Sequence, residues 1–99
     1  MKITTWNVNS VNARIEHLIK FIKKDQSDIY LIQELKCTNE SFPKEELENI
    51  NYKCYVNGQK AWNGVAILSK ENIEISNFKI PNYQDVNSRF IETEISLKN

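Results

Sequence analysis

The stretch DIYLIQE, residues 28–34, is apolar from Ile29 to Ile32 and then ends on Gln33 and Glu34. A short run of apolar residues at successive positions is typical of a strand that is covered on both faces of its sheet. Ligands of open α/β sheets bind beside the carboxyl ends of the strands, so an acid at that point is well placed to meet a substrate or a metal. Glu34 is therefore the first candidate for a functional residue.

A βαβ unit is predicted around this stretch. The residues KITTW at 2–6 predict an earlier strand that runs into NVNS at 7–10. Between the two strands, a helix over 11–25 with Ser10 as its N-cap is predicted by apolar residues spaced along one helical face, which are Val11, Ile15, Leu18, Ile19 and Ile22. The two strands of such a unit are parallel, so Asn7 and Glu34 are expected at the same edge of the sheet.

The remainder of the chain predicts a short helix over 44–48 and further strands over 52–56, 65–69, around 73–75 and over 90–95. The strands 52–56 and 65–69 suit a hairpin whose turn is either Asn57-Gly58 or Asn63-Gly64. We expect an α/β fold in which two helices cover one face of a mixed sheet of five or six strands. The other face would need a second layer from another copy, a partner or further sequence.

Length and composition indicate one domain over residues 1–99 with no internal boundary. Thirteen Lys and Arg balance thirteen Asp and Glu, so no bulk field attracts nucleic acid and any phosphate contact must be local. No secretory signal or membrane span is present in the sequence, which predicts a cytoplasmic protein without a membrane partner. Cys37 and Cys54 lack metal-site spacing and are expected to be free thiols.

Two side chains could bind a hard cation. Glu34 suits Mg²⁺, which takes oxygen ligands, although a solvated acid or a helix cap would look the same in the sequence. Asn7 could offer an amide oxygen to a metal or a donor to a phosphate, or it could form a turn with its own backbone. Lys36, Lys60 and Trp62 could contact DNA, against the alternative of two solvated lysines and a packed Trp.

Four blocks occur in order and at matching intervals: WNVNS at 6–10, QELKC at 33–37, NGVAILSK at 63–70 and RFIE at 89–92. With these blocks the chain resembles bacterial exonuclease III, the exodeoxyribonuclease III and AP endonuclease of the endonuclease/exonuclease/phosphatase superfamily. The similarity extends over essentially all 99 residues. The four blocks together are far more specific than any one of them.

The resemblance implies a four-layered α/β sandwich of which this chain is the N-terminal half. It also implies a DNA repair nuclease that uses Mg²⁺, or Mn²⁺ in its place, to cut duplex DNA beside abasic sites and to remove nucleotides from 3′ ends. Glu34 falls on the family's metal-binding glutamate and Asn7 on its asparagine at the phosphate and metal site, with Asn9 beside them as a substrate contact. Arg14 remains as a phosphate contact, whereas Asn12 stands where the family commonly has Arg.

The catalytic set is expected to be incomplete in this chain. The family's catalytic Tyr, its Asp-x-Asn pair and its final Asp-His pair have no counterpart up to Asn99, and His17 falls on the polar side of the first helix. We therefore expect a single incomplete domain that is inactive alone and meets duplex DNA when the missing half is supplied. The alternatives are a non-catalytic truncated or split-gene fragment that acts with a complementary chain or by self-association, and a phosphoesterase of the same superfamily with another phosphoester substrate.

Overall fold

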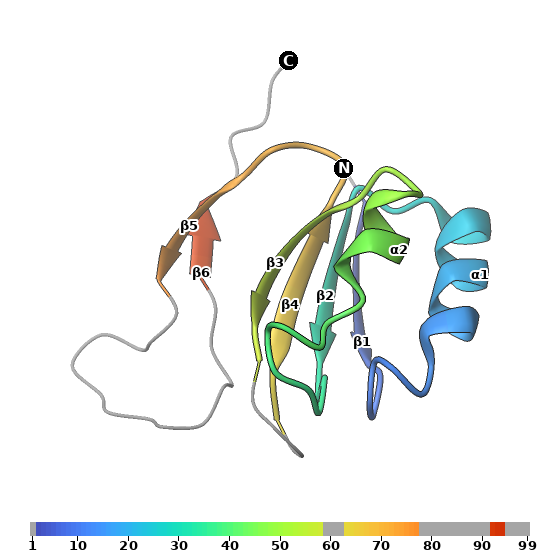
Figure 1. Cartoon of the computed structure of the whole chain (residues 1–99). Helices are drawn as coiled ribbons and strands as arrows, with labels where there is room; N and C mark the ends of the chain where they lie inside the picture. The colour runs from blue at the N-terminus through green and yellow to red at the C-terminus, as the bar shows by residue number, and fades with distance from the viewer. Residues whose placement is uncertain (1, 59–62, 78–91, 95–99) are drawn as a thin grey trace.

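The computed structural model describes residues 2–58, 63–77 and 92–94 (Figure 1). Neither helix in this described part of the chain has the length and apolar character needed to cross a membrane. The elements follow in the order β1 Ile3–Asn7, α1 Ile15–Asp25, β2 Ile29–Gln33, α2 Lys44–Glu48, β3 Lys53–Asn57, β4 Val65–Ser69, β5 Glu74–Asn77 and β6 Glu92–Glu94.

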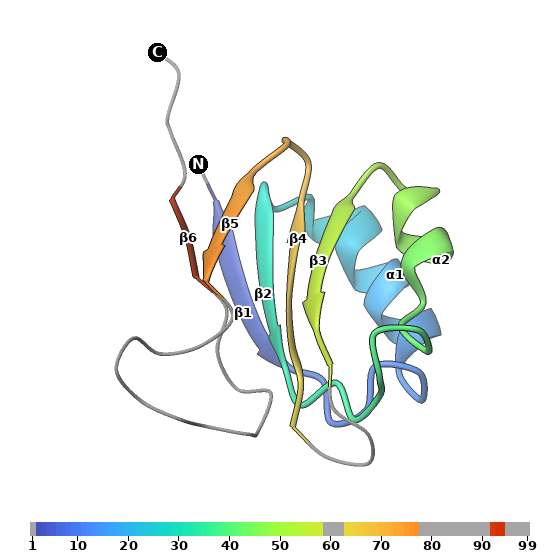
Figure 2. The same ribbon diagram turned by 60° about the vertical axis from the view of Figure 1, so that its left-hand side comes forward.

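Strands β1 to β4 form a mixed sheet in the order β1-β2-β4-β3. β1 and β2 are parallel, with Ile3 opposite Ile29 and Asn7 opposite Gln33. β4 is antiparallel to both of its neighbours. Both helices lie on one face of this sheet, as Figures 1 and 2 show from two directions. The predicted βαβ unit and the α/β fold with helices on one face are confirmed.

The main core lies between the sheet and the helices. Leu18 and Ile22 of α1 and Leu47 of α2 are fully buried against the sheet, where Tyr30 and Ile32 lie at alternate positions of β2. Each fully buried Leu or Ile side chain contributes about 1.5–3 kcal/mol relative to an exposed one. The α1 side chains therefore stabilise the crossover that keeps β1 and β2 side by side.

The face of the sheet away from the helices is also apolar. Ile29 and Ile67 are each only 2% exposed there, whereas Ile3 at the β1 edge is 51% exposed. The hydroxyl of Tyr55 accepts a hydrogen bond from the backbone N–H of Ile73 at 3.1 Å. This bond holds the segment after β4 on the same side of the sheet. The antiparallel pair of β5 and β6 lies on this side of the sheet (Figures 1 and 2).

The predicted single sheet of five or six strands is wrong, because the described strands divide into a sheet of four and a sheet of two. β4 already has β2 and β3 as neighbours, so β5 cannot pair beside it and pairs with β6 instead. Of the strand predicted over 90–95, residues 92–94 form β6 and the others lie outside the described residues.

The first helix begins later than its periodicity predicts. α1 starts at Ile15, residues 11–14 form a turn, and Ser10 does not cap the helix. The backbone N–H groups of Ser10 and Val11 donate to the carbonyl oxygens of Glu34 and Leu35 at 2.9 and 3.0 Å. These tertiary bonds hold the start of the predicted helix in a non-helical path.

A polar network joins the other end of β1 and β2, where the carboxylate of Asp25 is the common acceptor. The Lys2 ammonium and the Ser27 hydroxyl each donate to it at 2.5 Å, and the Tyr30 hydroxyl donates at 2.9 Å. The Tyr52 hydroxyl donates to the carbonyl oxygen of Ser27 at 2.6 Å and extends the network to the start of β3. The Lys2 and Ser27 hydrogen bonds hold the pKa of Asp25 well below its usual range.

Substitution of Asp25 by Asn should make unfolding less sensitive to acid. Asp25 stays ionised in the folded chain but takes up a proton near its ordinary pKa of about 3.9 when unfolded. Its contribution to stability is therefore present above that pH and is lost as the pH falls towards the folded pKa. We expect Asp25→Asn to lower the free energy of unfolding at pH 7 and to flatten its decline between pH 5 and pH 3, measured by urea denaturation.

The control is Glu40→Gln, which removes an exposed acid and should leave the acid dependence unchanged. An equally steep loss of stability in Asp25→Asn and in the unmodified chain would contradict the assignment.

Candidate functional site

Three loops meet where β1 and β2 end, at the lower edge of the sheet in Figure 1. They are residues 8–14, residues 34–43 and the β3–β4 connection, of which residues 58, 63 and 64 are described. Ser10 donates its backbone N–H to Glu34 O at 2.9 Å, and Lys36 donates its own to Asn63 O at 2.9 Å. The loop that carries Glu34 is therefore bonded to both of the others.

The backbone at this edge is left-handed at several residues other than Gly. The φ angles of Asn9, Glu34, Lys36 and Asn63 are 47°, 55°, 55° and 56°. Asn adopts this conformation readily, but Glu and Lys do so at a cost of roughly 1–2 kcal/mol each. Leu35 between them is fully buried and anchors the loop. Residues held in such sparsely populated conformations cluster at functional sites.

Four of the predicted site residues form one chain of hydrogen bonds. The Lys36 ammonium donates to Asn9 Oδ1. The backbone N–H of Asn9 donates to Asn7 Oδ1 at 3.0 Å, and Asn7 Nδ2 donates to Glu34 Oε2. This series of hydrogen bonds starts at the Lys36 cation and ends at the Glu34 anion, and every donor in it points towards the carboxylate. The structure thus brings Asn7, Asn9, Glu34 and Lys36 together.

Residues 4–97 match the Endonuclease/Exonuclease/phosphatase family. The chain belongs to this family. It is 36% identical to the exodeoxyribonuclease III of Haemophilus influenzae over 102 aligned residues, which cover 98% of this chain and 38% of that protein. The resemblance to exonuclease III is confirmed.

Solved structures of family members have the same fold. A 3′ phosphatase from Neisseria, NExo, bound to a product DNA hairpin, is 38% identical with a TM-score of 0.91, over 97% of this chain and 38% of that one. An AP endonuclease from Archaeoglobus fulgidus is 36% identical with a TM-score of 0.90, over 97% of this chain and 37% of that one. The chain thus spans less than two fifths of the length of each of these relatives.

Arg14, the other predicted site residue that the structure describes, is not part of this hydrogen-bond chain. Arg14 is exposed at the residue before α1, and its backbone N–H bonds Ser10 O at 3.2 Å. Lys60 and Trp62 lie outside the described residues. His17 is exposed on α1, as predicted.

The donor set at this edge fits a hard divalent cation. Glu34 is half-buried and brings a carboxylate, and the neighbouring Asn side chains bring neutral amides. The described residues contain no group of three or more His, Cys, Asp or Glu side chains that could hold a metal. Mg²⁺ is commonly held by one or two carboxylates while it keeps several waters, so the residues fit this ion.

The two cysteines do not add soft ligands. Both are free thiols, as predicted, and both pack in or against the main core. Burial raises the pKa of Cys37, and burial followed by the nearby Glu48 raises the pKa of Cys54 to about 12. Neither thiol ionises at neutral pH, and the thiolate is the form that binds metals or attacks substrates.

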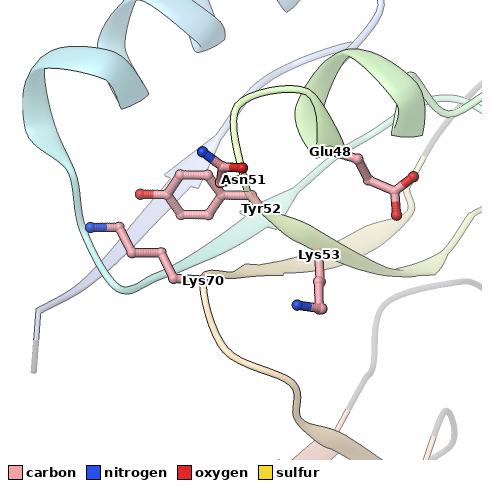
Figure 3. Close-up of a pocket in the computed structure, with 5 residues that line it drawn as sticks. All are labelled: Glu48, Asn51, Tyr52, Lys53 and Lys70. Atoms are coloured by element: carbon pink, nitrogen blue, oxygen red, sulfur yellow. The ribbon is translucent and has the colours of Figure 1, made fainter.

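A shallow hollow at the opposite end of the sheet does not belong to this site. It is lined by Glu48, Asn51, Tyr52, Lys53 and Lys70 (Figure 3). The Tyr52 hydroxyl is bonded within the Asp25 network, and Lys70 Nζ donates to Gln26 O at 3.1 Å. Both groups are therefore bonded within the fold, at the end of the sheet away from Glu34.

Gly58 is a residue of this edge that its sequence pattern did not indicate, because an Asn-Gly pair also suits a hairpin turn. Asn57 instead lies within β3, and the connection to β4 runs over residues 58–64. A Cβ at Gly58 would lie 2.5 Å from Cys37 O and 2.8 Å from the Thr38 carbonyl carbon. Its backbone N–H donates to Asn39 Oδ1 at 2.6 Å. Only glycine allows β3 to approach the loop after Glu34 so closely.

Gly58→Ala should destabilise the chain and displace the loop over 34–39. The added methyl group meets backbone atoms, which cannot rotate away, and overpacking of this kind costs about 1–3 kcal/mol. We expect a lower free energy of unfolding in urea, with shifted amide resonances at Glu34 and Lys36. Glu40→Ala, an exposed change in the same loop, should leave both unchanged. Wild-type stability in Gly58→Ala would show that the close approach is not required.

Proposed function

We propose that the Glu34 edge is part of the metal and phosphate site of a DNA repair nuclease. Its reaction would be hydrolysis of phosphate esters at abasic sites and 3′ ends of duplex DNA. The observation that carries the proposal is the series of hydrogen bonds from Lys36 to Glu34. It occurs in a protein chain that is 36% identical to an exodeoxyribonuclease III. The relatives named as an AP endonuclease and a 3′ phosphatase support abasic sites and 3′ ends as substrates.

Each residue of the edge has a distinct task in this proposal. Glu34 holds Mg²⁺, or Mn²⁺ in its place, and Asn7 lies beside the carboxylate. When bound, the metal supplies positive charge that polarises a phosphate and offsets charge on the leaving oxygen. Lys36 and Arg14 contact phosphate oxygens, with Lys60 and Trp62 as further DNA contacts from the β3–β4 connection. These local cations suit a chain whose formal net charge is zero.

Proton transfer needs groups other than Glu34. A carboxylate that binds a cation and accepts a bond from Asn7 is a poor base for the attacking water. His17 is exposed on α1, so it does not replace the family's base. We propose that the base comes from a complementary part of the site outside the described residues. The chain alone then binds metal and DNA without efficient cleavage.

Removal of the Glu34 charge should strongly weaken metal binding at this edge. In an NMR titration with MgCl₂ we expect the amide resonances of residues 7–10 and 34–36 to shift. Glu34→Gln should weaken Mg²⁺ binding by more than about tenfold, because even outer-shell partners of metal ligands contribute roughly 10–100-fold. Glu40→Gln is the matched control and should bind Mg²⁺ like the wild type.

The same preparations can be assayed on duplexes that carry an abasic site or a 3′ phosphate. Any cleavage should require Mg²⁺ and disappear in Glu34→Gln. Cleavage that persists in that variant, or Mg²⁺ shifts that leave residues 7–10 and 34–36 unchanged, would refute the role of Glu34.

Lys36→Gln should weaken DNA binding in a salt-dependent way. An ammonium that contacts one phosphate releases about one counterion, so its loss reduces the slope of log affinity against log salt by roughly 0.9. Fluorescence anisotropy of a labelled abasic duplex at several salt concentrations measures this slope. Lys24→Gln removes an exposed lysine near the C-terminus of α1 and should leave the salt slope unchanged. Equal slopes for Lys36→Gln and wild type would exclude the phosphate contact.

A further inference from the structure

The side-chain amide of Asn7 has only one orientation that satisfies both of its neighbours. Its Oδ1 accepts the backbone N–H of Asn9 at 3.0 Å, and its Nδ2 donates to Glu34 Oε2. A flipped amide would place oxygen against the carboxylate and NH₂ against the N–H of Asn9. Both contacts would then be repulsive, since a carboxylate only accepts and a backbone N–H only donates.

Asn9 is itself held in place from two directions. Its backbone is left-handed with a φ of 47°, and its side-chain oxygen accepts a bond from the Lys36 ammonium. The loop of Lys36 is in turn bonded to Asn63 through the Lys36 backbone N–H. The donor that fixes Asn7 is a backbone N–H, so its position depends on the path of the loop and not on a side-chain rotamer.

The fixed orientation of Asn7 decides which carboxylate oxygen of Glu34 is hydrogen-bonded. Of its two carboxylate oxygens, Oε2 accepts from Asn7, and among the described residues no donor reaches Oε1. We propose that Asn7 is a positioning residue that leaves Glu34 one oxygen for a divalent cation, so that the site favours Mg²⁺ over Ca²⁺. This rests on the proposed metal function of Glu34. It assigns Asn7 to the carboxylate, in place of the metal ligation that the family resemblance implies.

The selectivity follows from the different demands of the two ions. Mg²⁺ takes few protein ligands and keeps several waters, so one carboxylate oxygen suffices. Ca²⁺ takes six to eight oxygens and often uses both oxygens of a carboxylate. An Asn7 amide bound to Oε2 competes with that second contact. It therefore penalises Ca²⁺ and leaves Mg²⁺ unaffected.

The test compares dissociation constants for the two ions, measured by NMR titration of the full chain with MgCl₂ and separately with CaCl₂. Asn7→Ala and Asn7→Leu both remove the donor, and leucine also retains most of the side-chain volume. We expect each variant to raise Ca²⁺ affinity relative to Mg²⁺ by about tenfold, the lower end of the range for outer-shell partners. Asn12→Ala alters an exposed asparagine in the same loop and should leave the ratio at its wild-type value.

Glu34→Gln separates this inference from the function on which it rests. If Glu34→Gln abolishes binding of both ions but the Asn7 variants keep the wild-type ratio, the positioning role is overturned and the metal site stands. If Glu34→Gln binds both ions like the wild type, the metal site itself is wrong. A wild-type chain that binds Ca²⁺ more tightly than Mg²⁺ also overturns the inference, whether or not the variants fold.

Discussion

The parallel pairing of β1 with β2 is the constraint on which the candidate site depends. Its hydrogen bonds continue beyond the strands, since Val8 and Ser10 donate their backbone N–H groups to Gln33 O and Glu34 O at 3.0 and 2.9 Å. This register places Asn7 opposite Gln33 and next to the carboxylate of Glu34. A slip of one residue would turn the Asn7 side chain to the other face of the sheet and break the contact.

The two ends of these strands have opposite polar chemistry. At one end the Asp25 carboxylate is surrounded by Lys2, Ser27 and Tyr30, and its hydrogen bonds stay within the fold. At the other end the Glu34 carboxylate is half-buried and accepts from a single side chain, Asn7, among the described residues. A carboxylate with several internal donors contributes to folding, whereas one with a free oxygen can accept an external cation. The same functional group, a carboxylate, therefore stabilises the fold at one end and is the proposed metal ligand at the other.

The sequence predicted the meeting of Asn7 and Glu34 because that depends on strand order and on the carboxyl ends of parallel strands, both of which local patterns specify. β4 over 65–69 also has its predicted bounds. The predicted start of the first helix at residue 11 was wrong. The backbone bond from Ser10 to Glu34 takes the place of the first helical turn. The left-handed backbone at Lys36 could not be predicted either, since it depends on contact with Asn63, far along the chain.

The proposed separation of metal binding from proton transfer follows from how this edge is built. The contacts that orient the Glu34 carboxylate come from the loops after β1 and β2, with support from Asn63 and Gly64 before β4. The side chains that make those contacts, Asn7, Asn9 and Lys36, carry amide or ammonium groups, and neither group is a general base that could take a proton from water. In the function proposed above, this edge would hold the metal and a phosphate, and a base from another element would complete hydrolysis. In this proposed division of tasks, Glu34 holds the cation through the carboxylate that Asn7 orients, and the base comes from elsewhere.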